Sequence, residues 1–102
     1  MDASKKKRLR KAGWRTGSAA QFLHLSKEEE ELIEMKLRLS SLVRNARKRK
    51  HMSQVRLAER LGSSQSRVAK IESADPSVSL DLLVRASLAT GASRRELARA
   101  IA

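Results

Sequence analysis

The chain has 102 residues and no cysteine, and its 23 lysines and arginines outnumber 11 aspartates and glutamates, which gives a net charge of +12. A chain of this length packs one small core of about 70 to 80 residues. The lack of cysteine excludes disulfides and Cys/His zinc sites, and a positive charge far beyond what solubility needs favours a polyanionic partner.

Residues 1–25 are predicted to form an extended or mobile basic arm ahead of one folded domain over residues 26–102. The arm carries seven basic residues, with Asp2 as its only acid. Its basic cluster is not followed by the apolar stretch of a signal peptide, and no apolar run approaches the roughly 20 residues of a membrane span. We therefore expect a cytoplasmic protein.

A long helix is predicted from about residue 27 to residue 50. Ser26 and Glu29 match a capping box, glutamates fill the first turn, and basic residues gather at the far end, where the helix dipole favours them. One stripe of this helix is predicted to face the core, and it comprises Leu32, Met35, Leu39, Leu42, Val43 and Ala46.

A second apolar stripe on the same helix holds Ile33 and Leu37, with Ser40 and Arg44 nearby. A helix that is apolar on two sides usually has two neighbours. The arm adds further apolar residues without an obvious core role: Trp14, Phe22, Leu23 and Leu25. Two interpretations stay open for Trp14 and Phe22, because they could bind a partner or close the end of the core as a hydrophobic staple.

Two short helices are predicted next, each opened by a serine cap. Ser53 caps a helix that ends at Leu61, and Ser64 caps one that ends near Glu72. Residues 73–77 then form a loop, because Pro76 disfavours helix there.

Two more helices complete the domain. Ser79 caps the fourth helix, which Gly91 ends, and its predicted core face comprises Leu80, Leu83, Val84 and Leu88. Ser93 and Glu96 form a capping box for the fifth helix, in which Leu97 and Ile101 should face inward. No strand pattern is present, so the sequence predicts an all-α fold of five helices.

The stretch SQVRLAERLGSSQSRVAKIE, residues 53–72, has the spacing of a helix-turn-helix unit. Leu57 and Leu61 face inward on the first helix, and Ala58 leaves room for the second helix to cross. Gly62 makes the turn, and the second helix buries two apolar residues, Val68 and Ile71.

Residues 40–101 resemble the Cro/CI-type, or XRE, family of DNA-binding domains. The matching residues are Ser53-Gln54, Leu57-Ala58, Leu61-Gly62, Ser66, Val68, Ile71-Glu72 and Ser79-Leu80. The resemblance implies a five-helix lambda-repressor-like domain whose second helix-turn-helix helix lies in the major groove. It also implies a buried structural ion pair between Arg47 and Glu72.

Carried onto this chain, the family pattern implies that base edges are read by Gln65, Ser66, Arg67 and Lys70. Glutamine can pair with adenine and arginine with guanine, which suits these positions. The residues expected at DNA phosphates are Gln54, Ser63 and Ser64, although Ser64 is at least as important as a helix cap.

The chain from Gly13-Trp14-Arg15-Thr16-Gly17 through Phe22-Leu23-His24-Leu25-Ser26, followed by the Glu-rich helix and the helix-turn-helix, resembles HigA-type antitoxins. Such antitoxins neutralise a RelE/HigB-like mRNA-cleaving toxin by direct binding and repress their own operon. The resemblance implies a toxin-binding surface of Trp14, Phe22, Leu23, Leu25, Ile33 and Leu37. The alternative is a stand-alone XRE-family repressor without a toxin partner.

A homodimer is expected, because one reading helix covers only a few base pairs and dimers of this class bind half-sites about 10 bp apart. The first candidate for the dimer surface is the fifth helix, with Leu97, Ala100 and Ile101, and the second is Ile33 with Leu37.

Catalysis is not expected, since no triad spacing and no Gly-rich phosphate loop occur. No cofactor or metal is expected either, with only His24 and His51 as histidines.

Overall fold

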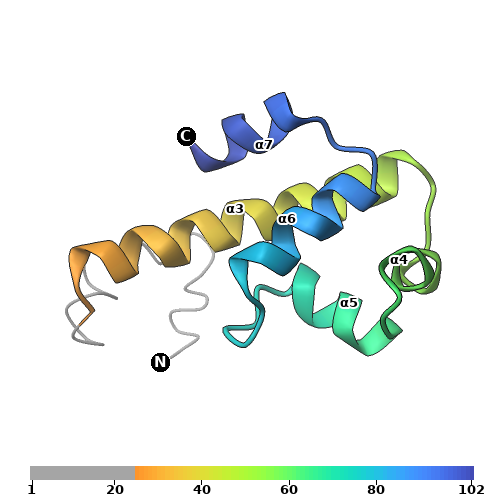
Figure 1. Ribbon diagram of the computed structural model, residues 1–102, viewed down its shortest axis with the longest axis horizontal. Coiled ribbons are helices and arrows are strands. Elements are labelled where there is room, and N and C mark those ends of the chain that lie inside the picture. The colour runs from red at the N-terminus through yellow and green to blue at the C-terminus, as the bar shows by residue number, and fades with distance from the viewer. Residues whose placement is uncertain (1–24) are drawn as a thin grey trace. The chain divides into compact units, whose positions relative to one another are not determined.

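The computed structural model describes residues 25–102, which form five α-helices and no strand (Figure 1). With the helix labels of Figure 1, these are α3 (Lys27–Arg49), α4 (Gln54–Leu61), α5 (Gln65–Glu72), α6 (Leu80–Ala89) and α7 (Arg94–Ile101). The predicted all-α fold is confirmed, and the predicted helix boundaries agree closely with the observed ones. None of the described helices is both long and apolar enough to cross a membrane.

The described residues belong to two compact units, with the division between Glu34 and Met35 inside α3. Residues 25–34 contain the start of α3, where the predicted capping box is present. The Glu29 backbone N–H donates to Ser26 Oγ at 3.1 Å, and the Ser26 N–H donates to Glu29 Oε1 at 2.9 Å. Most of the predicted arm, residues 1–24, lies outside the described residues.

The other four helices begin at the predicted serine caps. Ser53, Ser64, Ser79 and Ser93 each accept a hydrogen bond from the backbone N–H three residues on. Such caps satisfy amides that a helix N-terminus leaves unpaired, and each stabilises its helix by about 1 kcal/mol. The serines therefore fix where the short helices begin.

The turn between α4 and α5 depends on Gly62, which adopts the left-handed conformation with φ of 63°. Its N–H donates to the Glu59 carbonyl at 3.1 Å, and the Ser63 N–H donates to the Ala58 carbonyl at 2.9 Å. These two bonds satisfy carbonyls at the end of α4, and glycine adopts this conformation without the steric cost of a side chain. The chain can then reverse tightly into α5.

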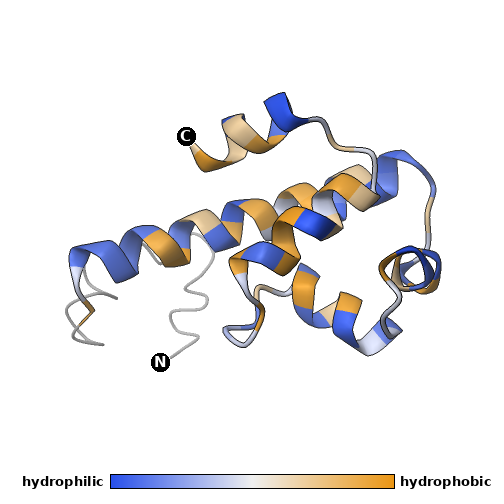
Figure 2. Cartoon of the chain, in the orientation of Figure 1, coloured by the Kyte–Doolittle hydropathy of each residue, from blue (hydrophilic) through white to orange (hydrophobic). Residues whose placement is uncertain are grey.

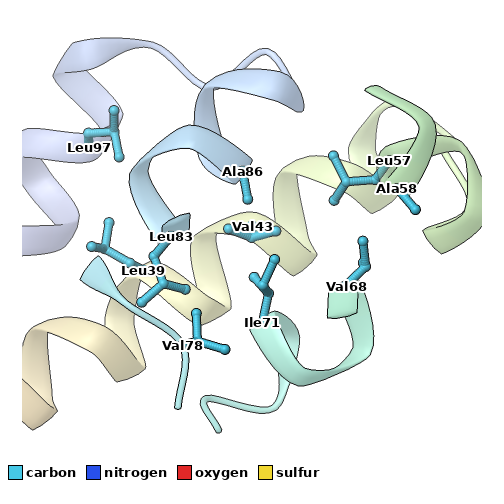
Figure 3. Packing of buried hydrophobic residues seen from close by; sticks show 10 residues of the cluster. All are labelled: Leu39, Val43, Leu57, Ala58, Val68, Ile71, Val78, Leu83, Ala86 and Leu97. Carbon is cyan, nitrogen blue, oxygen red and sulfur yellow. The ribbon is translucent and has the colours of Figure 1, made fainter. Parts of the chain in front are cut away.

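The core of residues 35–102 lies where α3, α4, α5 and α6 approach one another, with Leu97 added from α7 (Figure 3). Figure 3 shows side chains from these helices directed into one cluster. Its buried members are Leu39, Val43, Leu57, Ala58, Val68, Ile71, Val78, Leu83, Ala86 and Leu97. Apolar residues gather on the inward faces of these helices, whereas the first turns of α3 are hydrophilic (Figure 2). The core thus holds α4 and α5 against α3.

Three apolar residues predicted to face the core are exposed. Leu32 is 39% exposed, Leu88 47% and Ile101 40%. The most buried residues of α6 and its cap are the predicted Leu83 together with three smaller residues, Ala86, Ser87 and Thr90. The predicted core face of α6 was therefore wrong only at Leu88, since Leu80 and Val84 are half-buried and pack against the core. The hydropathy pattern also missed Ser87 and Thr90, because both are polar.

Three buried hydroxyls, two at α6 and one in α3, are hydrogen-bonded to backbone carbonyls. In α6 and its cap, Ser87 Oγ donates to the Leu83 carbonyl at 2.9 Å, and Thr90 Oγ1 donates to the Ser87 carbonyl at 2.6 Å. Ser40, predicted to lie near the second stripe of the long helix, is also buried, and its hydroxyl donates to the Ile71 carbonyl. A hydroxyl that is hydrogen-bonded to a backbone carbonyl can be buried without the full cost of losing water.

Candidate nucleic-acid interface

The candidate interface is built on α4, the Gly62 turn and α5. Leu57 and Ala58 of α4 are buried against the same core as Val68 and Ile71 of α5. The two helices are in direct contact and lie together beside α3 (Figure 1). This is the helix-turn-helix arrangement, in which one face of the second helix packs and the other is presented to solvent.

The outer face of α5 is polar and positively charged. Gln65, Ser66, Arg67 and Lys70 are all exposed, while Val68 and Ile71 on the opposite face are buried. Among the described residues, no hydrogen bond or ion pair engages the side chain of Arg67. The structure therefore brings the four predicted base-reading residues onto one accessible helix face.

Serines occupy the turn and the start of α5. Ser64 Oγ accepts a hydrogen bond from the Arg67 backbone N–H at 3.1 Å and lies 3.2 Å from Ser66 Oγ. Ser63, Ser64 and Ser66 are all exposed. Ser64 therefore acts as the helix cap, and Ser63 presents its hydroxyl to solvent beside it.

A connected set of polar side chains links the start of α5 to α3. Gln65 Nε2 donates to Gln54 Oε1 at 2.8 Å, and Gln54 Nε2 donates to Glu72 Oε1 at 3.1 Å. Glu72 in turn forms an ion pair with Arg47, with Nε 2.5 Å from Oε2 and Nη2 3.0 Å from Oε1. The predicted partners Arg47 and Glu72 therefore meet, and the two glutamines connect this pair to the exposed face of α5.

The remaining donor of Arg47 fixes the end of α3. Arg47 Nη1 donates to the Met52 carbonyl at 2.7 Å, just before the cap of α4. The side chains of Arg47 and Glu72 are only 12% and 4% exposed. A largely buried pair with this many hydrogen bonds holds α3, α4 and α5 in one relative arrangement.

The link between Gln54 and Gln65 was not predicted from the sequence. Gln54 was expected to hold a phosphate, whereas the structure engages both ends of its amide inside the protein. One sequence signal was present, because each helix of the unit begins with glutamine directly after its capping serine. Equivalent positions at the two helix starts can approach each other when the helices cross.

The loop after α5 carries an acid close to Lys70. Hydrogen bonds from the Ser77 hydroxyl and the Ser77 backbone N–H lower the pKa of Asp75 below its ordinary value, and the charge of Lys70 contributes. Asp75 therefore stays ionised at neutral pH. Its hydrogen bonds with Ser77 shape the turn that leads from α5 towards α6.

The residues predicted to bind a toxin are only partly within the described chain. Trp14, Phe22 and Leu23 lie outside it. Leu25 and Ile33 are half-buried, and Leu37 is 40% exposed. Within residues 25–102, no group of His, Asp or Glu side chains is arranged to hold a metal ion.

The fold and this surface define the class of helix-turn-helix DNA-binding proteins. The helix-turn-helix family model HTH_3 matches residues 43–100, which is more than half of the chain, and the protein belongs to this family. The family is one of non-enzymatic domains that bind specific DNA sequences and regulate transcription. Comparisons with curated proteins and with solved structures gave no match.

Replacing Glu72 with alanine should lower the free energy of unfolding by about 3 to 5 kcal/mol, because Arg47 would remain largely buried without its partner. The matched control is Glu59→Ala, which breaks an exposed pair with Arg56 at 3.2 Å. That loss should cost about 0.5 kcal/mol or less. Urea denaturation followed by circular dichroism measures both, and equal costs for the two variants would contradict a structural role for the Arg47–Glu72 pair.

Proposed function

We propose that the exposed face of α5 reads base edges in the major groove of an operator and that the protein acts as a transcriptional repressor. The observation that carries this proposal is the accessibility of Gln65 and Arg67 at the start of α5. Glutamine can make two hydrogen bonds to adenine, and arginine can make two to guanine. The first turn of the second helix is also the part that reaches bases in helix-turn-helix proteins.

Gln65 is supported in this role by the rest of the polar network. Its amide nitrogen donates to Gln54, which limits the rotation of the side chain. Ordering a long side chain in advance reduces the entropy lost when it contacts a base. Gln54, Ser63 and Ser64 lie at the starts of α4 and α5, where backbone amides and hydroxyls can contact phosphates.

The protein is proposed to act as a homodimer on two half-sites. Ile101 of α7 is 40% exposed, which leaves apolar surface at the end of this helix for a second copy. Ala100 is half-buried and packs partly against the core. Leu97 is not available for that contact, because it is 7% exposed and belongs to the core. The proposed dimer contact therefore uses Ile101 in the last turn of α7 rather than Leu97.

We further propose that the protein is an antitoxin that binds a RelE/HigB-like toxin and represses its own operon. The resemblance of residues 13–26 to HigA-type antitoxins supports this role. The exposed acids Glu28, Glu29 and Glu31 would complement a basic, RNA-binding toxin and speed association. Leu37 offers an exposed apolar contact on the same helix. A repressor without a toxin partner is the alternative.

Replacing Arg67 with alanine should weaken operator binding by about 1 to 3 kcal/mol and relax preference at one base position. The operator would first be selected from random duplexes with the unaltered protein, and affinities would then be measured by fluorescence anisotropy. Arg95→Ala is the matched control, since it removes the same charge from α7, on the other side of α3 from α5 (Figure 1). Unchanged affinity and base preference in Arg67→Ala would count against α5 as the reader.

Replacing Trp14 or Phe22 with alanine in the full chain should weaken toxin binding by about 2 kcal/mol or more, because aromatic anchors often carry much of an interface's energy. Operator binding should be unchanged in both variants. Co-expression with the RelE/HigB-like toxin encoded beside the gene tests this, with growth as the readout and Val55→Ala as an exposed apolar control. Full rescue by both aromatic variants, or the lack of any such toxin gene, would favour the stand-alone repressor.

A further inference from the structure

An open groove of about 260 Å³ lies between the last turns of α3 and the second half of α5. Arg44 and Lys48 line it from α3, and Ala69 and Ser73 line it from α5 and its cap. Arg47, Gln54 and Glu72 complete its lining.

The charged side chains of this groove that are not paired within residues 25–102 are positive. Glu72, its only acid, accepts from Arg47 through both oxygens and from Gln54 through one of them, so its charge is neutralised inside the protein. Arg44 and Lys48 are exposed, and within residues 25–102 neither side chain forms an ion pair or a hydrogen bond. The two cations are therefore available to an anion from outside.

Arg44 and Lys48 also lie on the same face of α3. They are four residues apart in α3, which places them on one helix face about 6 Å apart along the axis. Like charges at this spacing repel each other unless an anion lies near both. Ala69 and Ser73 have the same spacing, and their small side chains leave the opposite side of the groove open. An extended polyanion fits this shape better than a single compact ion does.

The groove adjoins the proposed reading face. Gln54 lines the groove and also accepts the hydrogen bond from Gln65, the first base-reading residue. Ala69 is the immediate neighbour of Lys70 in α5. A DNA strand whose bases meet α5 would therefore have its backbone close to the groove.

We propose that Arg44 and Lys48 bind the phosphodiester backbone of the DNA next to the bases that α5 reads. This rests on the proposed function, in which α5 enters the major groove. The long helix α3 thereby adds phosphate contacts from outside the helix-turn-helix, and the Arg47–Glu72 pair holds α3 in the position from which it makes them. Such contacts raise affinity and fix the register of the protein without reading sequence.

The test compares the salt dependence of DNA binding in three full-length variants. Arg44→Gln/Lys48→Gln removes the groove cations, and Arg94→Gln/Arg95→Gln removes the same charge from α7. Gln65→Ala/Arg67→Ala removes two proposed readers. Fluorescence anisotropy would be measured from about 50 to 200 mM salt on the selected operator and on an unrelated duplex. Circular dichroism would establish that each variant is folded.

The groove variant should flatten the slope of log affinity against log salt by about 1.8 on both duplexes, because each phosphate contact contributes about 0.9. Its preference for the operator should persist. The α7 variant should change the slope by less than half as much. Lys48→Gln alone should flatten this slope by about 0.9, which provides a second measurement if the double variant is unstable.

An unaltered slope in the groove variant, or an equal change in the α7 variant, would overturn the proposal. A role of these cations in helix stability alone would shift the melting temperature and leave the slope unaltered, which also overturns it. The variant Gln65→Ala/Arg67→Ala distinguishes base reading by α5 from phosphate binding in the groove. If Gln65→Ala/Arg67→Ala loses the operator preference while the groove variant keeps the salt slope of the unaltered protein, α5 remains the proposed reader. Phosphate binding by Arg44 and Lys48 is then rejected.

Discussion

The buried ion pair between Arg47 and Glu72 is the interaction on which the arrangement of this domain depends. It joins the end of α3 to the end of α5, and the third nitrogen of Arg47 binds the chain just before α4. Burying a charge is costly unless it is paired and hydrogen-bonded. Here the guanidinium and the carboxylate satisfy each other, so a packing that separates the end of α3 from the end of α5 would leave both charges without a partner.

An apolar pair of similar size could stabilise the core as well, because replacing a buried ion pair with hydrophobic residues is often neutral or favourable. It could not hold Gln54, which donates to Glu72 and accepts from Gln65. The Arg47–Glu72 ion pair therefore connects the packing of the core with the orientation of Gln65 on the proposed reading face.

The sequence predicted those features that depend on local chemistry. Serine caps and a glycine turn act within a few residues, so the starts of the four short helices and the Gly62 turn could be assigned from Ser53, Ser64, Ser79 and Ser93. The core of α3 around Leu39 and Val43 followed from helical periodicity. The helix-turn-helix class was predictable because its spacing is restrictive.

What could not be predicted depends on contacts between distant residues. Ser40 and Ser87 are buried because carbonyls accept from them, and a hydropathy pattern does not register such bonds. Leu88 and Ile101 are exposed, although their hydropathy suggested the core. The link from Gln65 through Gln54 to Glu72 joins the starts of α4 and α5 to the end of α5. Arg44 and Lys48 line one groove only because α3 packs beside α5, which a sequence pattern does not show.

A double-mutant cycle on Gln54 and Gln65 tests most directly whether the polar network orients Gln65 on the proposed reading face. Operator affinity would be measured for Gln54→Ala, Gln65→Ala and the double variant, each shown to be folded. We expect the double variant to lose less than the sum of the single losses, with a coupling energy of about 0.5 to 3 kcal/mol. Losses that add within about 0.3 kcal/mol would contradict the account, since they would mean that Gln54 does not position Gln65 on DNA.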